Sequence, residues 1–210
     1  MNDWKVWDVV PVAECKRRTG KAPLKGRWVD VNKGDSIRPI VRCRWVAKEF
    51  NTYKSAEFFV ATPPLEALRM MVSHAASGRS HGRGGRKLLV IDARKAHLHA
   101  MAEREVYVDL PPEQTVPGMC SRLNRCLYGT RDAPARWEAF LARQLALIGF
   151  ARGKASPCCF RHASRDLRCV VHADDFIFVG PEPDLLWVQR AWRPISLLRL
   201  SAGSVATPTT

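Results

Sequence analysis

The segment 170–180 constrains this chain more than any other, because two adjacent aspartates interrupt an apolar, β-branched and aromatic run. The run predicts the two strands of a hairpin, over about 167–172 and 176–180, with Asp174 and Asp175 at the turn. Burying one carboxylate without a partner is costly, and two neighbouring carboxylates also repel each other. Divalent cations bind carboxylate oxygens, so the pair predicts a metal site. The alternative is a polar turn without a metal, because aspartate is common in turns.

The chain is strongly basic: its 210 residues include 34 Lys and Arg against 20 Asp and Glu, a formal net charge of +14. Hydrophobic residues make up 46% of the chain, which suffices for one domain or two small lobes. The excess of positive charge favours a polyanionic partner, and nucleic acid is the leading candidate. The alternative is a basic protein without such a partner.

The first residues lack the apolar region of a signal peptide, and no apolar run approaches the roughly 20 residues of a membrane span. The seven cysteines are odd in number and contain no CxxC pair, so they indicate neither a disulfide framework nor a zinc module. We therefore expect reduced thiols in an intracellular protein, cytoplasmic or nuclear, that is not secreted and has no membrane partner.

Turn residues and hydrophobic periodicity divide the rest of the chain into elements. Strands are predicted over 26–32, 40–50, 87–91, 106–110 and 121–127, helices over 65–77 and 133–148, a basic loop over 78–87 and a disordered tail over 201–210. Their order predicts the α+β class, an antiparallel sheet with helices packed on one face.

A third carboxylate, Asp92, follows the strand predicted over 87–91. If that strand neighbours the hairpin in the sheet, Asp92, Asp174 and Asp175 converge. Three converging carboxylates can hold two divalent ions, the arrangement used for in-line phosphoryl transfer. The alternative for Asp92 is a capping role at the end of the strand.

Five segments, in the same order along the chain, carry a resemblance to a known family. They are the basic strand at 41–50, the helix entry at 58–69, the strand end at 91–100, the helix entry at 127–137 and the hairpin at 171–175. Together they resemble the reverse transcriptase domain of copia-type LTR retrotransposons, over about residues 4–192. The resemblance implies a polymerase palm with fingers and RNA-directed DNA polymerase activity.

The resemblance also implies domains, cofactors and partners. Residues 1–60 are expected to form a fingers-like part, 61–192 the palm with the catalytic acids, and 193–210 a divergent tail. The expected cofactors are two Mg²⁺ ions, with Mn²⁺ as a substitute. The expected partners are an RNA or DNA template with its primer and deoxynucleoside triphosphates; the oligomeric state is not predicted.

By this resemblance, Asp92 and Asp174 are the principal metal ligands, with Asp175 beside them. Arg42 and Arg44 are expected to face the triphosphate, because a guanidinium can grip phosphate oxygens in a bidentate fork. The alternative for both arginines is a solvated strand face.

Two further residues of the predicted nucleotide site depart from the family pattern. His97 stands where the family usually has a bulky aromatic residue that screens the sugar 2′ position. Asp132 stands where the family usually has glutamine, and a carboxylate there repels a triphosphate unless Asp132 caps the following helix instead.

The leading hypothesis is therefore a reverse transcriptase domain that catalyses two-metal nucleotidyl transfer. Because the resemblance ends near Trp192, we expect a truncated copy and weak polymerase activity from this chain alone. The alternative is a catalytically inactive basic remnant that only binds nucleic acid. Another metal-dependent phosphotransferase is disfavoured, since it does not explain the segments at 41–50 and 127–137.

Overall fold

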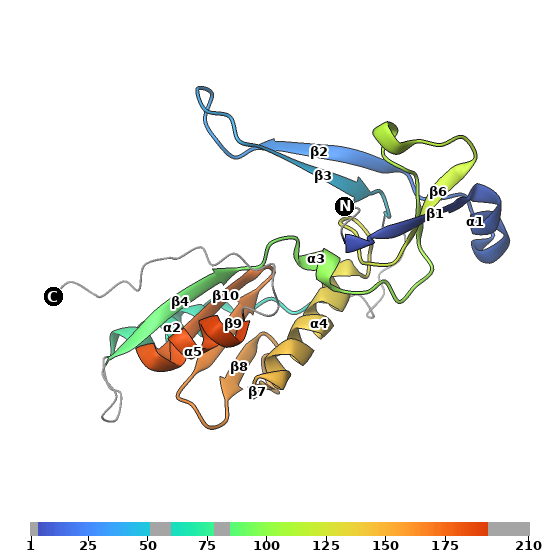
Figure 1. Cartoon of the computed structure of the whole chain (residues 1–210). Coiled ribbons are helices and arrows are strands. Elements are labelled where there is room, and N and C mark those ends of the chain that lie inside the picture. The colour runs from blue at the N-terminus through green and yellow to red at the C-terminus, as the bar shows by residue number, and fades with distance from the viewer. Residues whose placement is uncertain (1–3, 51–59, 78–84, 193–210) are drawn as a thin grey trace. The chain divides into compact units, whose positions relative to one another are not determined.

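The chain, described here from a computed structural model, folds into two compact units (Figure 1). Each unit is built from two separate stretches of the sequence. The first unit contains Met1–Phe59 and His97–Trp137, and the second contains Val60–Ala96 and Glu138–Thr210. Within these units the structure describes residues 4–50, 60–77 and 85–192. Most of the loop predicted over 78–87, and all of the tail predicted to be disordered, lie outside the described residues. The predicted boundaries between fingers, palm and tail stay a prediction.

The second unit is built on one five-stranded antiparallel sheet in the order β4-β10-β9-β8-β7. Its strands are β4 (Arg86–Asp92), β7 (Phe150–Arg152), β8 (Cys159–His162), β9 (Arg168–His172) and β10 (Asp175–Pro181). The strand β10 lies between β4 and β9, so the hairpin predicted from the sequence occupies the middle of the sheet. The antiparallel sheet and the hairpin are confirmed.

Helices cover both faces of this sheet, α2 (Leu65–Ala76) on one and α5 (Glu182–Trp192) on the other (Figure 1). Alternate residues of β10 point to opposite faces. Val179 packs in one buried cluster with Met71 of α2. Phe176 and Phe178 instead place their rings 5.4 and 6.2 Å from the ring of Trp192 in α5. The expectation of helices on one face is therefore wrong, although the α+β class is confirmed.

The first unit contains a three-stranded sheet in the order β1-β6-β5 and a separate two-stranded ribbon. The strands of the sheet are β1 (Trp7–Pro11), β5 (Tyr107–Val108) and β6 (Met119–Leu123), and those of the ribbon are β2 (Gly26–Asn32) and β3 (Val41–Ala47). The helix α1 (Val12–Thr19) follows β1, and a short 3-10 helix spans Pro112–Gln114. The helices α3 (Ala96–His99) and α4 (Ala133–Leu147) contain the points where the sequence passes between the units.

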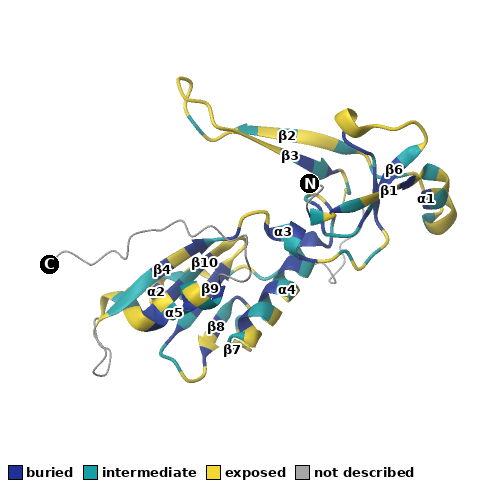
Figure 2. Cartoon of the chain, viewed as in Figure 1, coloured by how far each residue is buried: buried dark blue, intermediate teal, exposed yellow. Residues whose placement is uncertain are grey.

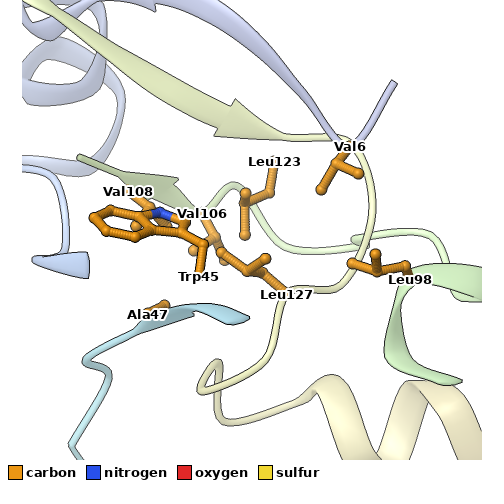
Figure 3. Packing of buried hydrophobic residues seen from close by; sticks show 8 residues of the cluster. All are labelled: Val6, Trp45, Ala47, Leu98, Val106, Val108, Leu123 and Leu127. Carbon is orange, nitrogen blue, oxygen red and sulfur yellow. The ribbon is translucent and has the colours of Figure 1, made fainter. Parts of the chain in front are cut away.

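The core of the first unit lies at the base of the ribbon, where eight side chains pack together (Figure 3). They are Val6, Trp45, Ala47, Leu98, Val106, Val108, Leu123 and Leu127. Trp45 supplies the largest of these side chains and is only 4% exposed. Because side chains alternate along β3, burial of Trp45 turns its neighbours Arg44 and Val46 to the opposite face of the ribbon. Figure 2 shows that the end of the ribbon away from this core is largely exposed.

Most elements predicted from the sequence are present: the strand over 26–32 has the predicted bounds, those over 87–91 and 176–180 are longer, and those over 40–50 and 106–110 are shorter. The strand predicted over 121–127 is shifted to Met119–Leu123, because its partner β1 pairs with it from Trp7↔Leu123 to Pro11↔Met119. The elements β1, α1, β7, β8 and α5 were not predicted from the sequence. No helix in the described parts of the chain is long and apolar enough to cross a membrane. The structure describes all seven cysteines as free thiols.

Candidate active site and nucleotide-binding residues

The three predicted catalytic aspartates meet at one end of the five-stranded sheet. Asp92 is the last residue of β4 and Asp175 the first of β10, and the two are directly paired across the strands. The third, Asp174, lies in the turn beside them, where its carbonyl oxygen accepts a hydrogen bond from the backbone N–H of Ala93 at 2.8 Å. Side chains of directly paired residues lie on the same face of a sheet, so Asp92 and Asp175 face the same side.

The turn that positions this pair is tight. It consists of Ala173 and Asp174, and His172 pairs directly with Asp175 on its two sides. Ala173 has a φ of 57°, in the left-handed region that alanine rarely adopts. The hydrogen bond to Ala93 and the pairing with β4 hold this conformation.

Electrostatic repulsion distinguishes this end of the sheet. Partial burial raises the pKa of the Asp175 carboxyl above its usual range, and the charges of Asp174 and Asp92 raise it further. His172 opposes this effect by a smaller amount. The three carboxylates thus destabilise one another when all are ionised, and a cation among them relieves that repulsion.

The carboxylates fit a divalent cation by their chemistry, since hard oxygen donors suit Mg²⁺ and Mn²⁺. Within residues 4–50, 60–77 and 85–192, no group of three or more His, Cys, Asp or Glu side chains has the arrangement of a formed metal site. The structure therefore shows convergence of the acids, while their role as metal ligands stays a prediction.

Arg42 and Arg44, predicted to bind a triphosphate, share one face of the ribbon. They are directly opposite Val31 and Val29 of β2. The same alternation places Arg27, opposite Val46, on this face as well, which the sequence reading did not identify. We define Arg27, Arg42 and Arg44 as the ribbon arginines. That Arg42 and Arg44 face the triphosphate stays a prediction.

Tyr128 connects two of the predicted nucleotide-binding residues within the first unit. The guanidinium of Arg44 lies 5.6 Å from the centre of the Tyr128 ring, and the His97 ring lies 4.6 Å from it at an angle of 36°. The next residue, Gly129, has a φ of 84°, and a Cβ there would lie 2.0 Å from the carbonyl oxygen of Ala47. Glycine at this position lets the segment approach β3 closely, which brings Tyr128 to Arg44.

Asp132 is in a different environment. Its side chain is 4% exposed and its carboxylate binds Nη2 of Arg104 at 2.6 Å. Arg104 also binds Glu49 through two hydrogen bonds of 3.0 and 2.9 Å, and Glu49 accepts a 2.8 Å hydrogen bond from the backbone N–H of Arg131. Glu49, Arg104 and Asp132 form what we call the buried triad, after Asp132, its one buried side chain; Glu49 and Arg104 are 15% and 34% exposed. A carboxylate so enclosed is poorly placed to meet a nucleotide, so direct nucleotide binding by Asp132 loses support.

The sequence reading missed Tyr128, Arg104 and Glu49 as parts of the site. Tyr128 lies within the segment at 127–137 that carried the resemblance, and its neighbour Gly129 was the available signal for a close backbone approach. Arg104 and Glu49 have no comparable signal, since they meet across 55 residues of sequence.

Comparison with known proteins supports the assignment made from the segments. The family model described as reverse transcriptase (RNA-dependent DNA polymerase) matches residues 4–187. The retrovirus-related Pol polyprotein from transposon TNT 1-94 of Nicotiana tabacum is 30% identical over 182 residues, which cover 80% of this chain and 13% of that protein. The polyprotein from transposon RE1 of Arabidopsis thaliana is 25% identical over 191 residues, covering 86% and 12%. The resemblance to copia-type elements is confirmed, and the chain spans only a small part of the length of these relatives.

A solved structure shares the fold. The structure of telomerase from Candida albicans, in complex with a fragment of telomeric RNA, aligns with 100% of this chain and 45% of its own chain, with a TM-score of 0.52 and 9% sequence identity. At this identity the likeness shows the fold alone. It agrees with the polymerase-like α+β class expected from the order of the elements.

Proposed function

The chain belongs to the reverse transcriptase (RNA-dependent DNA polymerase) family, and we propose that it carries a site for template-directed addition of deoxynucleotides to a primer. The substrates are an RNA or DNA template with its primer and a deoxynucleoside triphosphate. Two Mg²⁺ ions, or Mn²⁺ in their place, are the proposed cofactors. Residence in the cytoplasm or nucleus stays a prediction.

The observation that carries this proposal is the direct pairing of Asp92 with Asp175, with Asp174 in the adjoining turn. Asp92, Asp174 and Asp175 would hold the divalent ions, which would supply a lowered pKa for the attacking hydroxyl and charge stabilisation for the leaving phosphate oxygen. The protein's contribution is to fix the carboxylates on one face of a rigid strand pair, so that little reorganisation is needed. The raised pKa of Asp175 supports a cation site at this position.

The ribbon arginines are the proposed contacts for the triphosphate or the nucleic-acid backbone. They share one face without an intervening acidic residue, because Asp30 of β2 alternates to the other face. Arg44 is further oriented by the Tyr128 ring. His97, on the other contact of Tyr128, is proposed to lie near the sugar of the nucleotide.

Single-nucleotide incorporation tests the proposal more sensitively than processive extension does. A labelled primer on RNA and DNA templates, with Mg²⁺ or Mn²⁺, should be extended by the natural chain. Asp92→Asn and Asp174→Asn should each lower the rate by about a thousandfold, equivalent to about 4 kcal/mol of transition-state stabilisation. Asp8→Asn is the matched control, because Asp8 is an exposed partner of Arg122 in the first unit and its loss should leave the rate within about twofold.

Incorporation, measured beside binding of nucleic acid, separates this proposal from the inactive basic remnant. Affinity for duplex DNA should fall steeply with salt, with a slope of log K against log salt of about −0.9 per neutralised phosphate. Salt-sensitive binding without incorporation under any of these conditions supports the remnant. A flat salt response contradicts both hypotheses.

A further inference from the structure

A cavity of about 750 Å³ lies in the second unit. One wall is the helix α2, and the other walls come from β7, β8 and β9. Its volume is in the range of pockets that enclose drug-sized ligands, about 300–1,000 Å³. None of the roles assigned above uses it.

The floor of this cavity contains an unusual pair of like charges. Arg161 of β8 is directly opposite Arg168 of β9, and both line the cavity. Directly opposed like charges destabilise an antiparallel pair of strands. Arg168 is compensated by Asp166 at 3.0 Å and also contacts His74. Arg161 is exposed, and no carboxylate pairs with it in the part of the chain that the structure describes. An anion between the two guanidinium groups therefore relieves the electrostatic repulsion between Arg161 and Arg168.

The wall formed by α2 is suited to an apolar, planar group. Met70 and Met71 both line the cavity, and Met70 is 71% exposed. Methionine side chains are polarizable and make favourable contacts with aromatic rings. Ser73 and Ser77 add hydroxyl groups beside them. Burial, then the charges of Arg168 and Arg86, lower the pKa of His74, so that its imidazole is a neutral hydrogen-bonding group at neutral pH.

The cavity opens on the same face of the sheet as the carboxylates. Arg168 is opposite Val179, which lies an even number of residues from Asp175 along β10. Their side chains therefore share a face, separated by about 13 Å at 3.3 Å per residue. The helix α2 packs over the strands between them, so the cavity and the carboxylates are two separate places on this face.

We propose that this cavity binds one nucleotide unit, free or within a single strand, with its phosphate between Arg161 and Arg168 and its base against Met70 and Met71. The choice of a nucleotide over other phosphate carriers rests on the function proposed above. The observations that carry the site are the paired arginines, the methionine wall and the volume between them. Arginine suits the phosphate because it offers several donors in a fixed plane.

Cys159 provides a local reporter, because it lines the cavity and is partly exposed. Its alkylation by iodoacetamide is followed by mass spectrometry in EDTA, so that no divalent ion contributes. The probes are deoxyadenosine monophosphate, a ten-nucleotide single strand and inorganic phosphate. Either nucleotide probe should slow alkylation of Cys159 at least threefold, and inorganic phosphate should do so only at about tenfold higher concentration. Protection by the mononucleotide identifies a free nucleotide as a sufficient ligand, and protection by the strand alone identifies a strand.

Two matched pairs of variants test the assigned contacts. Arg161→Gln should raise the half-protecting nucleotide concentration at least tenfold, while Arg190→Gln, an exposed arginine of α5, should change it less than twofold. Met70→Ser should weaken protection by the nucleotide about fivefold and leave phosphate unchanged, whereas Val72→Ser, exposed on the same helix but outside the cavity, should have no effect. Equal protection by phosphate and nucleotide, or equal effects of Arg161→Gln and Arg190→Gln, would overturn the proposal.

The outcome is independent of catalysis. The Asp175→Asn variant, which removes a proposed catalytic group, should show the same protection of Cys159 as the natural chain. Loss of nucleotide incorporation with intact protection leaves this site standing and counts against the proposed function. Nucleotide incorporation with no protection of Cys159 by either nucleotide probe supports the proposed function and overturns the nucleotide site in the cavity.

Discussion

Two groups of carboxylates in this molecule are in opposite electrostatic situations. In the first unit, Glu49 and Asp132 are both bound by Arg104, whose pKa is raised above its usual value by hydrogen bonds to Asp132 and Glu49. In the second unit, Asp92 and Asp175 face each other across two strands and the pKa of Asp175 is raised by burial and by neighbouring negative charge. Arg104 neutralises the first group, whereas the second has no ion pair to Lys or Arg among the residues that the structure describes.

The difference separates a structural role from a functional one. The buried triad satisfies its charges internally, so its members are held in place and offer little to a ligand. The paired aspartates keep a repulsion that folding alone does not remove. Such unfavourable arrangements persist where an external partner completes them, which is typical of functional sites.

The largest expected effect comes from breaking the buried triad. Arg104→Met leaves Glu49 and the 4% exposed side chain of Asp132 without their shared cation. Removing one partner of a fully buried ion pair costs about 3–5 kcal/mol, and because Arg104 itself is 34% exposed we expect about 2 kcal/mol here. The first unit should therefore unfold at a lower denaturant concentration. Chemical denaturation followed by tryptophan fluorescence measures the change.

The matched control is Arg122→Met in the same unit. Arg122 binds Asp8 and Glu14 near the surface, with side chains 35%, 51% and 20% exposed. Pairs of this kind contribute about 0–1 kcal/mol. Similar losses of unfolding free energy for Arg104→Met and Arg122→Met would show that the buried triad stabilises the protein no more than an ion pair near the surface does.

A smaller effect of opposite sign is expected at the paired aspartates. Asp175→Asn removes one of the repelling charges, so the second unit should become more stable by about 0.5–1 kcal/mol at pH 7 without divalent ions, after allowance for solvent screening. Added Mg²⁺ should stabilise the natural chain more than the variant, since binding to the folded state raises its stability. Thermal unfolding with and without Mg²⁺ measures both. Destabilisation by Asp175→Asn in EDTA contradicts the assigned repulsion.

The smallest expected effect is the pH dependence of the stability difference between Asp175→Asn and the natural chain. The folded-state pKa of Asp175 lies above its unfolded value of about 3.9, so its favourable contribution is present below that pH and is lost as the pH rises through the folded pKa. The advantage of Asp175→Asn should therefore be small near pH 3.5 and grow toward pH 7. A difference in melting temperature that is constant with pH argues against the raised pKa.

Asp166 provides the control of opposite sign in the same unit. Burial tends to raise the pKa of Asp166, but hydrogen bonds and charges from Arg86 and Arg168 outweigh it and lower the pKa below its usual value. Its contribution is therefore present above the unfolded pKa and is lost as the pH falls through the folded one. Asp166→Asn should destabilise at pH 7 and have less effect in acid.

The convergence of the aspartates could be predicted, but their pairing could not. A strand end at Asp92 and a turn at Asp174 were readable from the sequence, because apolar runs and turn residues are local signals. Which residue of β4 faces Asp175 depends on register, which many residues of the sheet set together. The buried triad had no local signal at all, since its members lie far apart in sequence.

The packing of a helix on the second face of the sheet was not predicted, for a related reason. The strand predicted over 176–180 has no polar side chain, so it contains no polar alternation to mark an exposed side. Both faces of β10 are buried, one against α2 and the other against α5. The strands β7 and β8 were missed because they are short, at 3 and 4 residues, and include exposed arginines.

The alternation of β10 ties the position of one carboxylate to the packing of two aromatic rings. Phe176 and Phe178 must face α5, so Asp175 must face the other way, toward Asp92. An insertion of a single residue between Asp175 and Phe176 preserves every apolar side chain but turns the carboxylate to the wrong side. Copies of this sequence that drift under mutation can therefore tolerate substitutions in the strand far better than changes in its length.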